Sequence, residues 1–453
     1  MSTVVVGAGI VGVSTAYYLS QNQPPVQDGV EPHAIHLVET TDSLFASASG
    51  FAGGFLARDW FAPAVAEVGA LSFDQHRALA DKYGGRKLWG YAESTSLSYG
   101  LPDEPGSDAD PKKERRRGED WLRQGTSRST SAPTAAVEGT VENGGLPAWL
   151  HRRSGDSVEV LANDGTTGQV DPLLFCQFLL KKAQESGVQL HQPARVVSVG
   201  TSNDNGSGEE LASVTIETGS AKVGGASSTS QTVLPCTKLV ITAGAWTPRV
   251  FDALFPGASA EGKPLLAVNN YSGHSLVVRP PTSFTAGASL TPSCHAIFAA
   301  GGPLTYCPEI FGRANGTLYM AGLNSSTEPL PRLATDSVPD PVKLDDLMAS
   351  CKRVLGIEAS SEQEREIEIV RTGLCHRPAT PWGFPLVLRM PDDTLKGAGG
   401  KLVKTKAGAA GGVFVAAGHG PWGISMAPGT GMVLAELVQG RPLSADLSSL
   451  GLR

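Results

Sequence analysis

Short apolar runs and helical periodicity set the architecture at the start of the chain. Residues 4–6 are three valines, which is the pattern of a fully buried strand, and residues 10–20 carry apolar side chains at helical spacing. A second apolar run at residues 34–39 predicts the next strand. The polar, proline-containing residues 21–32 predict a surface loop between them. This order of elements predicts an α/β fold built on a parallel sheet.

The same patterns continue along the chain. Asp171 followed by Pro172 predicts the start of a helix that Gly187 ends, and the amphipathic residues 340–355 predict another helix. Alternating or continuously apolar runs predict the remaining strands. These runs are residues 188–190, 195–199, 214–218, 238–246 with its closing glycine turn, 268–278, 296–305, 317–323 and 413–417.

Glycines at a specific spacing separate the first strand from the first helix. Gly7 permits a tight turn, Gly9 lets the backbone approach a pyrophosphate, and Gly12 lets the helix pack closely on the strand, so the helix N-terminus faces the negative charge. A structural tight turn is the alternative. In this context the turn predicts a dinucleotide site formed by Gly7, Ala8, Gly9, Ile10, Val11 and Gly12.

An acidic residue ends the second predicted strand. Glu39 is placed to accept hydrogen bonds from ribose hydroxyls, although it lies farther from Gly12 than the usual spacing of about 20 residues. The polar loop before the strand accounts for the extra length. We include Glu39 and the adjoining Thr40 among the cofactor-binding residues, with a solvated strand end as the alternative.

The C-terminal region repeats the order of the beginning. Residues 413–417 predict a buried strand, residues 418–429 a glycine-rich loop, and residues 430–438 a helix that Gly440 stops. A strand, glycine loop and helix near each end of the chain predict that both regions meet the same dinucleotide.

Composition narrows the class of protein. A chain of 453 residues with 41% hydrophobic residues and 54 glycines suits an α/β protein with two or three domains' worth of core. The net charge of −7 with dispersed basic residues argues against a nucleic-acid-binding surface. Six scattered cysteines without a C-x-x-C pair argue against a metal site or a disulfide framework and predict mostly buried thiols.

Targeting signals and membrane spans are not expected. The sequence enters its first strand at once, and no apolar run approaches the ~18 residues of a membrane span, so we expect a cytoplasmic protein. Three polar stretches, residues 102–119, 126–145 and 202–232, predict surface loops, the last around one hairpin. The basic run at 112–117 is flanked by acids and predicts a solvated loop.

Six segments together carry a family resemblance: residues 7–12, 47–54, 167–172, 242–246, 377–381 and 418–424. Their order resembles that of FAD-dependent amine oxidoreductases of the D-amino-acid oxidase, glycine oxidase and sarcosine oxidase superfamily. The Gly-His-Gly-Pro-Trp-Gly-Ile tail resembles a poorly characterised fungal branch. The resemblance implies a discontinuous Rossmann-like FAD-binding domain of residues 1–60, 156–262 and 395–453. It also implies an α+β substrate domain with a mixed or antiparallel sheet, residues 61–155 and 263–394, with flexible insertions near 102–145.

The resemblance implies roles for residues in the matching motifs. Ser47 and Ser49 are expected to contact the pyrophosphate, and the backbone of Val196 or Val197 to meet the adenine. Backbone N–H groups of residues 418–424 are expected to face the flavin O2, where negative charge grows on reduction. The cofactor-binding residues expected from these motifs are Ser47, Ser49, Val196, Val197, Ala243, Gly244, Trp246, Cys375, Gly418, Gly420, Gly423 and Ile424.

Arg377 is the main candidate for binding substrate. The resemblance places it where related oxidases carry an arginine that pairs with the substrate carboxylate, and a guanidinium suits such a bidentate clamp. A structural ion pair is the alternative. His419, Trp422 and His274 are further catalytic candidates, and Trp382 is another candidate to line the cavity, with ordinary packing as the alternative for each.

Two departures from the family pattern keep alternatives open. Cys375 stands where sarcosine-oxidase relatives carry a covalent flavin link, but the residues after it differ, so a buried thiol is the alternative. Tyr319 and Met320 stand on a strand where some relatives carry a lysine near flavin N5. Oxidase and dehydrogenase activities both therefore stay open.

The sequence thus predicts an FAD-dependent oxidoreductase that oxidises a small amine or amino acid by hydride transfer to flavin N5. The flavin performs this chemistry, so the protein chiefly positions the substrate. One alternative is a structural FAD in a protein-interaction or trafficking factor, with the loops at 102–145 recruiting the partner. An NAD-dependent dehydrogenase would explain residues 7–39 but not the C-terminal glycine loop.

Overall fold

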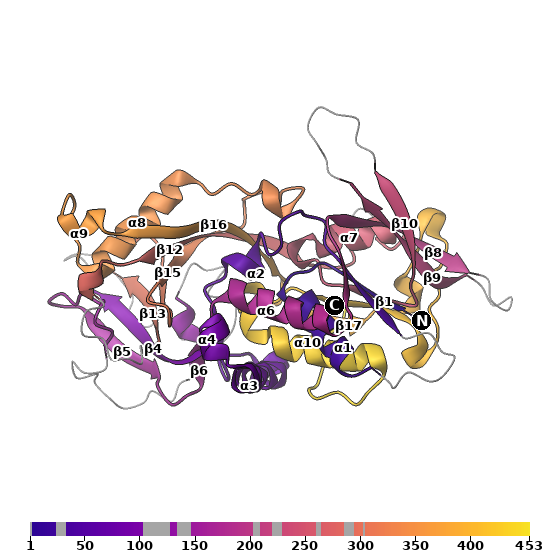
Figure 1. Ribbon diagram of the computed structural model, residues 1–453, viewed down its shortest axis with the longest axis horizontal. Coiled ribbons are helices and arrows are strands. Elements are labelled where there is room, and N and C mark those ends of the chain that lie inside the picture. The colour runs from indigo at the N-terminus through magenta and orange to yellow at the C-terminus, as the bar shows by residue number, and fades with distance from the viewer. Residues whose placement is uncertain are drawn as a thin grey trace.

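The computed structural model describes residues 2–23, 33–102, 127–133, 146–202, 209–219, 229–259, 264–284, 294–301 and 304–453. Within these ranges the molecule is elongated, with a largely parallel sheet toward one end and a larger mixed sheet toward the other (Figure 1). Most of the predicted insertion at 102–145, including the basic run at 112–117, lies outside the described residues.

The first sheet has six strands in the order β17-β18-β11-β1-β2-β7. All of its pairs are parallel except β17 with β18, as the buried apolar runs predict. The strands are β1 (Ser2–Val6), β2 (Ala34–Val38), β7 (Gln189–His191), β11 (Lys238–Ile241), β17 (Leu386–Arg389) and β18 (Gly412–Ala417). The α/β fold predicted from the sequence is confirmed.

Two layers cover this sheet. Val5 packs into a core with helices on one face, whereas Val4 and Val6 pack into a second core on the other face. The helices of the first layer are α1 (Ile10–Gln21), α6 (Pro172–Glu185) and α10 (Gly423–Gln439), with α3 (Ala66–Tyr83) packed against α10. The second layer contains α7 (Thr247–Leu254) and a three-stranded sheet of β8 (Ala194–Ser202), β9 (Glu210–Thr218) and β10 (Ser230–Pro235).

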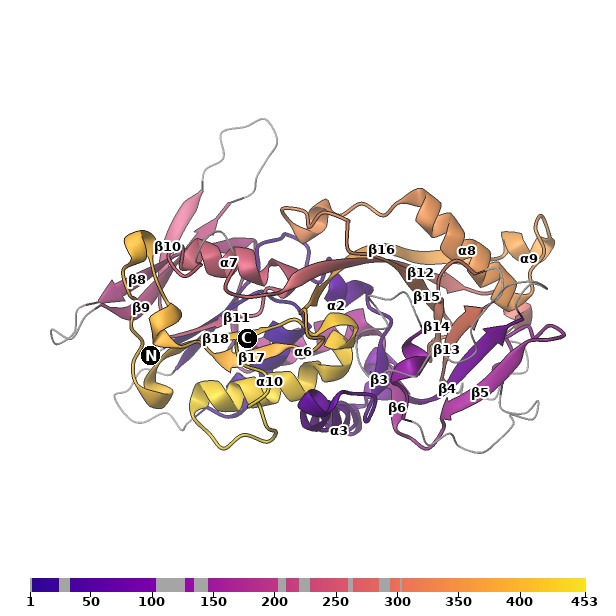
Figure 2. The ribbon, with the colours of Figure 1, turned by 180° about the vertical axis from the view of Figure 1, so that it is seen from behind.

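The second large sheet has nine strands, mostly antiparallel, and β16 crosses much of the length of the molecule beside β12 (Figure 2). The strands are β3 (Phe55–Ala57), β4 (Ala92–Leu101), β5 (Ser157–Ala162), β6 (Thr167–Gln169), β12 (Asn269–Arg279), β13 (Cys294–Gly301), β14 (Glu309–Gly312), β15 (Leu318–Ser325) and β16 (Glu368–Ala379). The remaining α-helices are α2 (Ala48–Phe51), α4 (Gly85–Trp89), α8 (Pro341–Leu355) and α9 (Glu362–Arg365).

The predicted helix starts follow from their capping residues. The Asp171 side chain accepts hydrogen bonds from the N–H groups of Leu173 and Leu174, and Pro172 occupies the first turn, where its missing N–H costs nothing. Asp340 caps α8 in the same way by accepting the N–H of Val342. Both starts are confirmed.

One predicted loop is wrong. Residues 418–429 were expected to be irregular because they are rich in glycine and include Pro428, yet α10 begins at Gly423 and continues through that proline. The stretch 202–232, expected to be a loop around one hairpin, holds the whole of β9 and the first residues of β10, and these two strands pair with each other. We retain the two-domain division as a proposal. Three strands from the ranges expected to form the FAD-binding domain, β3, β5 and β6, join the nine-stranded sheet, and β17, from the expected substrate domain, joins the six-stranded sheet.

The structure also describes the state of the cysteines and the length and polarity of the helices. All six cysteines are free thiols, and five of them are buried. In the ranges that the structure describes, every helix is too short or too polar to cross a lipid bilayer.

Candidate functional site

A cavity of about 720 Å³ lies at the carboxyl ends of the parallel strands. Val6 at the end of β1, Thr242 after β11 and Ala417 at the end of β18 all line it. This edge of an open α/β sheet is where such folds bind their ligands. The predicted residues that line the cavity are Gly7, Gly9, Ile10, Val11, Glu39, Thr40, Ser47, Ser49, Val196, Ala243, Gly244, Trp246, Cys375, Arg377, His419, Gly420, Gly423 and Ile424.

The glycine turn before α1 is closely packed. Gly7 has a φ of +100°, which favours glycine, and a Cβ there would lie 2.8 Å from the Cα of Ala243. A Cβ on Gly12 would lie 2.0 Å from the carbonyl oxygen of Gly7, so only glycine lets the helix start this close to the strand. Gly9 instead lines the cavity, and a Cβ there would lie 3.2 Å from Ser49 Oγ.

The Glu39 carboxylate is held rigidly beside this turn. One oxygen accepts the N–H of Ala8 at 3.0 Å, and the other accepts the N–H and the hydroxyl of Thr41 at 3.0 and 2.9 Å. The oxygen bonded to Ala8 accepts a single donor and retains capacity for another. Ala8 lies outside the cavity lining but fixes this acid at the cavity wall.

Two serine hydroxyls line the same wall. Ser49 Oγ accepts the N–H of Ile10 at 2.9 Å, and Ser47 Oγ accepts the N–H of His376 at 3.1 Å. Because each oxygen accepts a backbone N–H, its own hydroxyl hydrogen is left to donate to a ligand. Together with the N-terminus of α1, these groups suit an anion such as a pyrophosphate.

The turn at residues 420–424 forms the opposite wall and begins α10. Gly420, Pro421, Gly423 and Ile424 line the cavity, so the first turn of a long helix, with N–H groups that have no intrahelical partner, lies at its surface. His419 also lines the cavity, where its Nε2 contacts Thr430 Oγ1 at 3.1 Å.

Arg377 reaches the cavity from β16. Its guanidinium crosses the neighbouring strand at Gly273, where a Cβ would lie 2.0 Å from Nη1, and Nη1 donates to Asn324 Oδ1 at 2.8 Å. In the described part of the chain no carboxylate forms an ion pair with it. The arrangement therefore favours a cation reserved for a ligand over a structural ion pair.

Three candidates lie away from the cavity. His274 Nε2 accepts the N–H of Asp340 and so supports the start of α8. Trp422 is 2% exposed and packs edge-on against Phe61, and Trp382 packs against the second core with the Arg453 guanidinium over its ring. These contacts favour a structural role over a catalytic one for all three side chains.

Four predicted cofactor residues are also absent from the cavity lining: Ala8, Gly12, Val197 and Gly418. Val197 falls at a register shift between β8 and β9, and only Val196 lines the cavity. Gly12 acts through the packing of α1 on β1. Gly418 has a φ of +92° and turns the chain after β18.

A further segment, which we call the strap, lines the cavity although the sequence did not indicate it. Residues 332–335 line it, and the preceding Pro331 carbonyl accepts hydrogen bonds from Trp246 Nε1 at 3.0 Å and Arg249 Nη1 at 2.7 Å. His376, beside Arg377 on β16, also lines the cavity, and its Nδ1 contacts Asn270 Oδ1 at 3.0 Å. No local motif marks the strap, because its contacts join distant segments.

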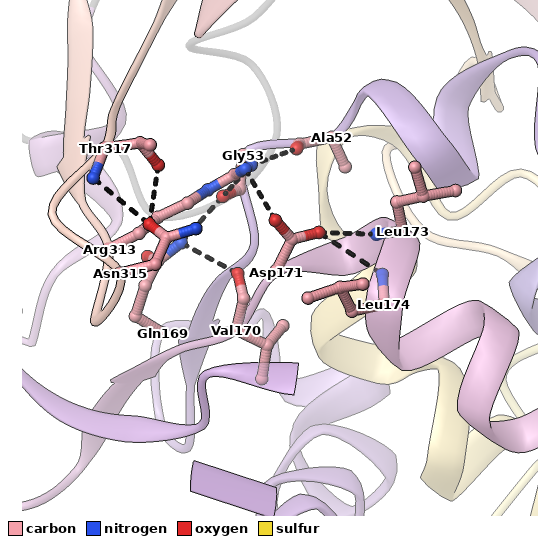
Figure 3. Close-up of polar contacts among 10 residues, drawn as sticks. All are labelled: Ala52, Gly53, Gln169, Val170, Asp171, Leu173, Leu174, Arg313, Asn315 and Thr317. Carbon is pink, nitrogen blue, oxygen red and sulfur yellow. Dashed lines mark hydrogen bonds and ion pairs between the residues drawn. The ribbon is translucent and has the colours of Figure 1, made fainter. Parts of the chain in front are cut away.

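A buried polar network holds the segment after α2 beside the cavity (Figure 3). Arg313, whose side chain is 4% exposed, donates to Asp171 at 3.0 Å and points toward the carbonyls of Ala52 and Gly53. Gln169 donates to the Gly53 carbonyl at 2.7 Å. Asp171 thus caps α6 with one oxygen and pairs with Arg313 through the other, which satisfies a charge that burial would otherwise penalise.

Acid is expected to destabilise the apoprotein through buried histidines. Burial lowers the pKa of His419 and of His76 on α3 to about 4, from 6.5 in an exposed histidine. As pH falls below 6.5 the unfolded chain is protonated first, so this stability is complete above pH 6.5 and is lost progressively down to about pH 4. Each histidine contributes a slope of at most about 1.4 kcal/mol per pH unit.

Urea unfolding of the apoprotein between pH 7 and pH 5 measures this effect. The free energy of unfolding should fall with pH, and His419→Gln should flatten the dependence, because glutamine does not titrate. An unchanged slope in the variant would show that His419 is protonated equally in both states.

These features define a class: an α/β protein that binds a dinucleotide at the carboxyl edge of its parallel sheet. The chain belongs to the family of FAD dependent oxidoreductases named DAO, whose family model matches residues 2–437. A protein of Schizosaccharomyces pombe named as an oxidoreductase is 26% identical over 458 residues, covering 99% of this chain and 96% of that protein. The expected family and the fungal resemblance are confirmed.

Solved structures share the fold. Glycine oxidase from Geobacillus kaustophilus has a TM-score of 0.65 at 19% identity, covering 100% of this chain and 98% of that one. L-proline dehydrogenase from P. horikoshii has a TM-score of 0.63 at 17% identity, covering 97% and 94%. The cofactor of this family is FAD, and the serine hydroxyls at the cavity wall, the held Glu39 carboxylate and the glycine turn fit that dinucleotide.

Proposed function

We propose that this chain oxidises a small amine or amino acid that bears a carboxylate, by hydride transfer from the carbon next to nitrogen to flavin N5. The observation that carries this proposal is Arg377, which lines the cavity and whose guanidinium donates to Asn324 and forms no ion pair with a carboxylate of the described residues. A half-buried cation of this kind is suited to an incoming carboxylate.

Different residues of the cavity wall would contact different parts of the FAD. Glu39 would accept from the ribose hydroxyls, Ser47 and Ser49 would donate to the pyrophosphate, and Val196 would meet the adenine. The turn at residues 420–424 would face the flavin pyrimidine. These assignments follow from groups that already lie at the cavity wall with a donor or acceptor to spare.

The flavin, when bound, supplies the hydride acceptor. Arg377 would bind the substrate carboxylate and so fix the direction of the carbon–hydrogen bond. Since amine oxidation needs a neutral nitrogen but no strong base, orientation accounts for most of what the side chains contribute.

The solved relatives support this substrate class. Glycine oxidase and L-proline dehydrogenase are both named for small amino acids, and their chains match nearly the full length of this one. One is named an oxidase and the other a dehydrogenase, so the electron acceptor is a separate question for this chain.

Anaerobic reduction of the bound flavin tests the proposal. We expect at least one member of a panel of glycine, D-amino acids, N-methyl amino acids and proline to bleach the flavin absorbance. Reoxidation by air, compared with reoxidation by a quinone or dye, then separates oxidase from dehydrogenase. A panel without any bleaching, on protein that contains FAD, would contradict the proposed substrate class.

Cys375 offers a separate prediction about the cofactor bond. The residue lines the cavity proposed to hold the cofactor and is 2% exposed. We expect contact without a covalent bond, because the residues after it depart from relatives that form one. Acid precipitation should therefore leave all yellow colour in the supernatant, and colour in the pellet that is lost in Cys375→Ala would contradict this.

A further inference from the structure

Helix α10 contains a proline that breaks its hydrogen-bond ladder near the cavity. Pro428 lies inside the helix and has no N–H, so the carbonyl of Ile424, four residues earlier, lacks its usual intrahelical donor. Ile424 lines the cavity and is buried. A buried carbonyl without a donor is costly, so another group must satisfy it.

His76 on α3 satisfies that carbonyl. Its Nε2 lies 2.9 Å from the Ile424 oxygen, and since a carbonyl only accepts, Nε2 carries the proton. The His76 side chain is fully buried, and its Nδ1 has no hydrogen-bond partner among the described residues. Burial lowers the pKa of His76 to about 4, so the imidazole is neutral and one ring nitrogen serves the helix.

Ser72, one turn earlier on α3, repairs the next step of the ladder. Its hydroxyl accepts the N–H of Gly429 at 3.0 Å and donates to the carbonyl of Ser425 at 2.6 Å, two groups that bond to each other in an unbroken helix. A Cβ on Gly429 would lie 2.7 Å from the Val68 carbonyl oxygen, so glycine permits this close approach. Val68, Ser72 and His76 lie four residues apart on one face of α3.

The repaired segment is continuous with the turn at the cavity. Figure 2 shows α3 lying against α10, and the turn at residues 420–424 joins the helix directly before the break. His76 itself is absent from the cavity lining. It can therefore affect a ligand only through the backbone that it holds.

We propose that His76 is a positioning residue for the flavin: by holding the Ile424 carbonyl that Pro428 leaves without a donor, it orients the backbone N–H groups at the start of α10. This inference rests on the placement of the flavin beside that turn in the proposed function. The N–H groups stabilise the negative charge that grows on the flavin pyrimidine during reduction, and an ordered turn stabilises it more than a loose one.

The variant His76→Met tests the proposal, because methionine fills a similar volume but has no donor. We expect the reduced flavin to lose about tenfold in affinity relative to the oxidised flavin, which lowers the two-electron midpoint potential by about 30 mV. His76→Gln should restore the potential, since its amide can donate to the same carbonyl. The matched control is Tyr18→Phe, which removes a hydrogen bond to Gln75 on α3 away from the cavity.

A double variant tests whether the effect of His76→Met depends on the N–H that Pro428 lacks. Pro428→Ala returns an N–H to the helix, so His76→Met should shift the potential less in that background than alone. Amide exchange of residues 423–429 should rise in His76→Met and fall again in the double variant, with or without FAD. An unchanged potential in His76→Met, or equal shifts in both backgrounds, would overturn the inference.

The two hypotheses fail in different ways. Protein that binds FAD but is bleached by no amine would contradict the proposed substrate class while leaving the potential of His76→Met measurable. If His76→Met folds too poorly for electrochemistry, the stability of the double variant decides the matter, because the N–H returned by Pro428→Ala should restore the fold. A double variant that folds as poorly as His76→Met would overturn the inference.

Discussion

Replacing Arg377 with methionine is expected to lower kcat/KM for a carboxylate-bearing amine substrate by about 100- to 1,000-fold, the cost of about 3–4 kcal/mol that follows loss of one partner from a buried charge pair. KM should rise because binding is lost, and kcat should also fall because the substrate is no longer oriented. FAD should stay bound, since the guanidinium contacts Asn324 and the backbone of Ser272. Stopped-flow reduction of the flavin measures both parameters.

Comparing substrates with and without a carboxylate shows whether Arg377 binds that carboxylate or supports the structure in general. An amine of similar size without a carboxylate should react with wild type and Arg377→Met at similar rates, because such a substrate has no group for the guanidinium to bind. Arg279→Met is the matched protein control: it removes an exposed arginine that pairs with Glu368 across the same two strands. Equal losses with both substrates would show that Arg377 supports the strand rather than the carboxylate.

Gly12→Ala and Gly9→Ala are expected to fail in different ways, although they lie in one turn. The new methyl on residue 12 would lie 2.0 Å from the Gly7 carbonyl oxygen and 2.6 Å from Thr242 Oγ1, so α1 must move away from β1. Overpacking of backbone on backbone should destabilise the fold by about 3 kcal/mol or more. Urea unfolding measures the loss, and the purified variant should carry little FAD.

The methyl on residue 9 meets only a side chain. It would lie 3.2 Å from Ser49 Oγ, which can rotate, so the apoprotein should be nearly as stable as wild type. The same methyl lines the cavity, so FAD affinity should fall by about tenfold or more. Titration of the apoprotein with FAD, followed by flavin fluorescence, distinguishes the two variants. Gly12→Ala with wild-type stability, or Gly9→Ala with wild-type affinity, would contradict this reading of the turn.

The cavity walls show why only some of the site could be predicted. The glycine turn, Glu39 and the two serines at the start of α2 belong to local motifs, and all of these elements meet at the cavity. His274 and Trp422 were chosen by residue type and motif, yet hydrogen bonding to the α8 start and packing against Phe61 occupy them. Residue type does not reveal which way a side chain points.

Sequence alone determined the elements whose causes are local. Three valines and the spaced glycines are enough for β1, the turn and α1, and Asp171 with Pro172 is enough to start α6, because caps and tight turns depend on neighbours in the chain. Only the tertiary structure decided where α10 begins. Glycines and Pro428 disfavour a helix locally, but Ser72 and His76, the latter 348 residues from the carbonyl it holds, supply the missing hydrogen bonds. The same holds for Arg377: its motif gave the position, whereas Gly273 and Asn324, on other strands, determine where its guanidinium lies.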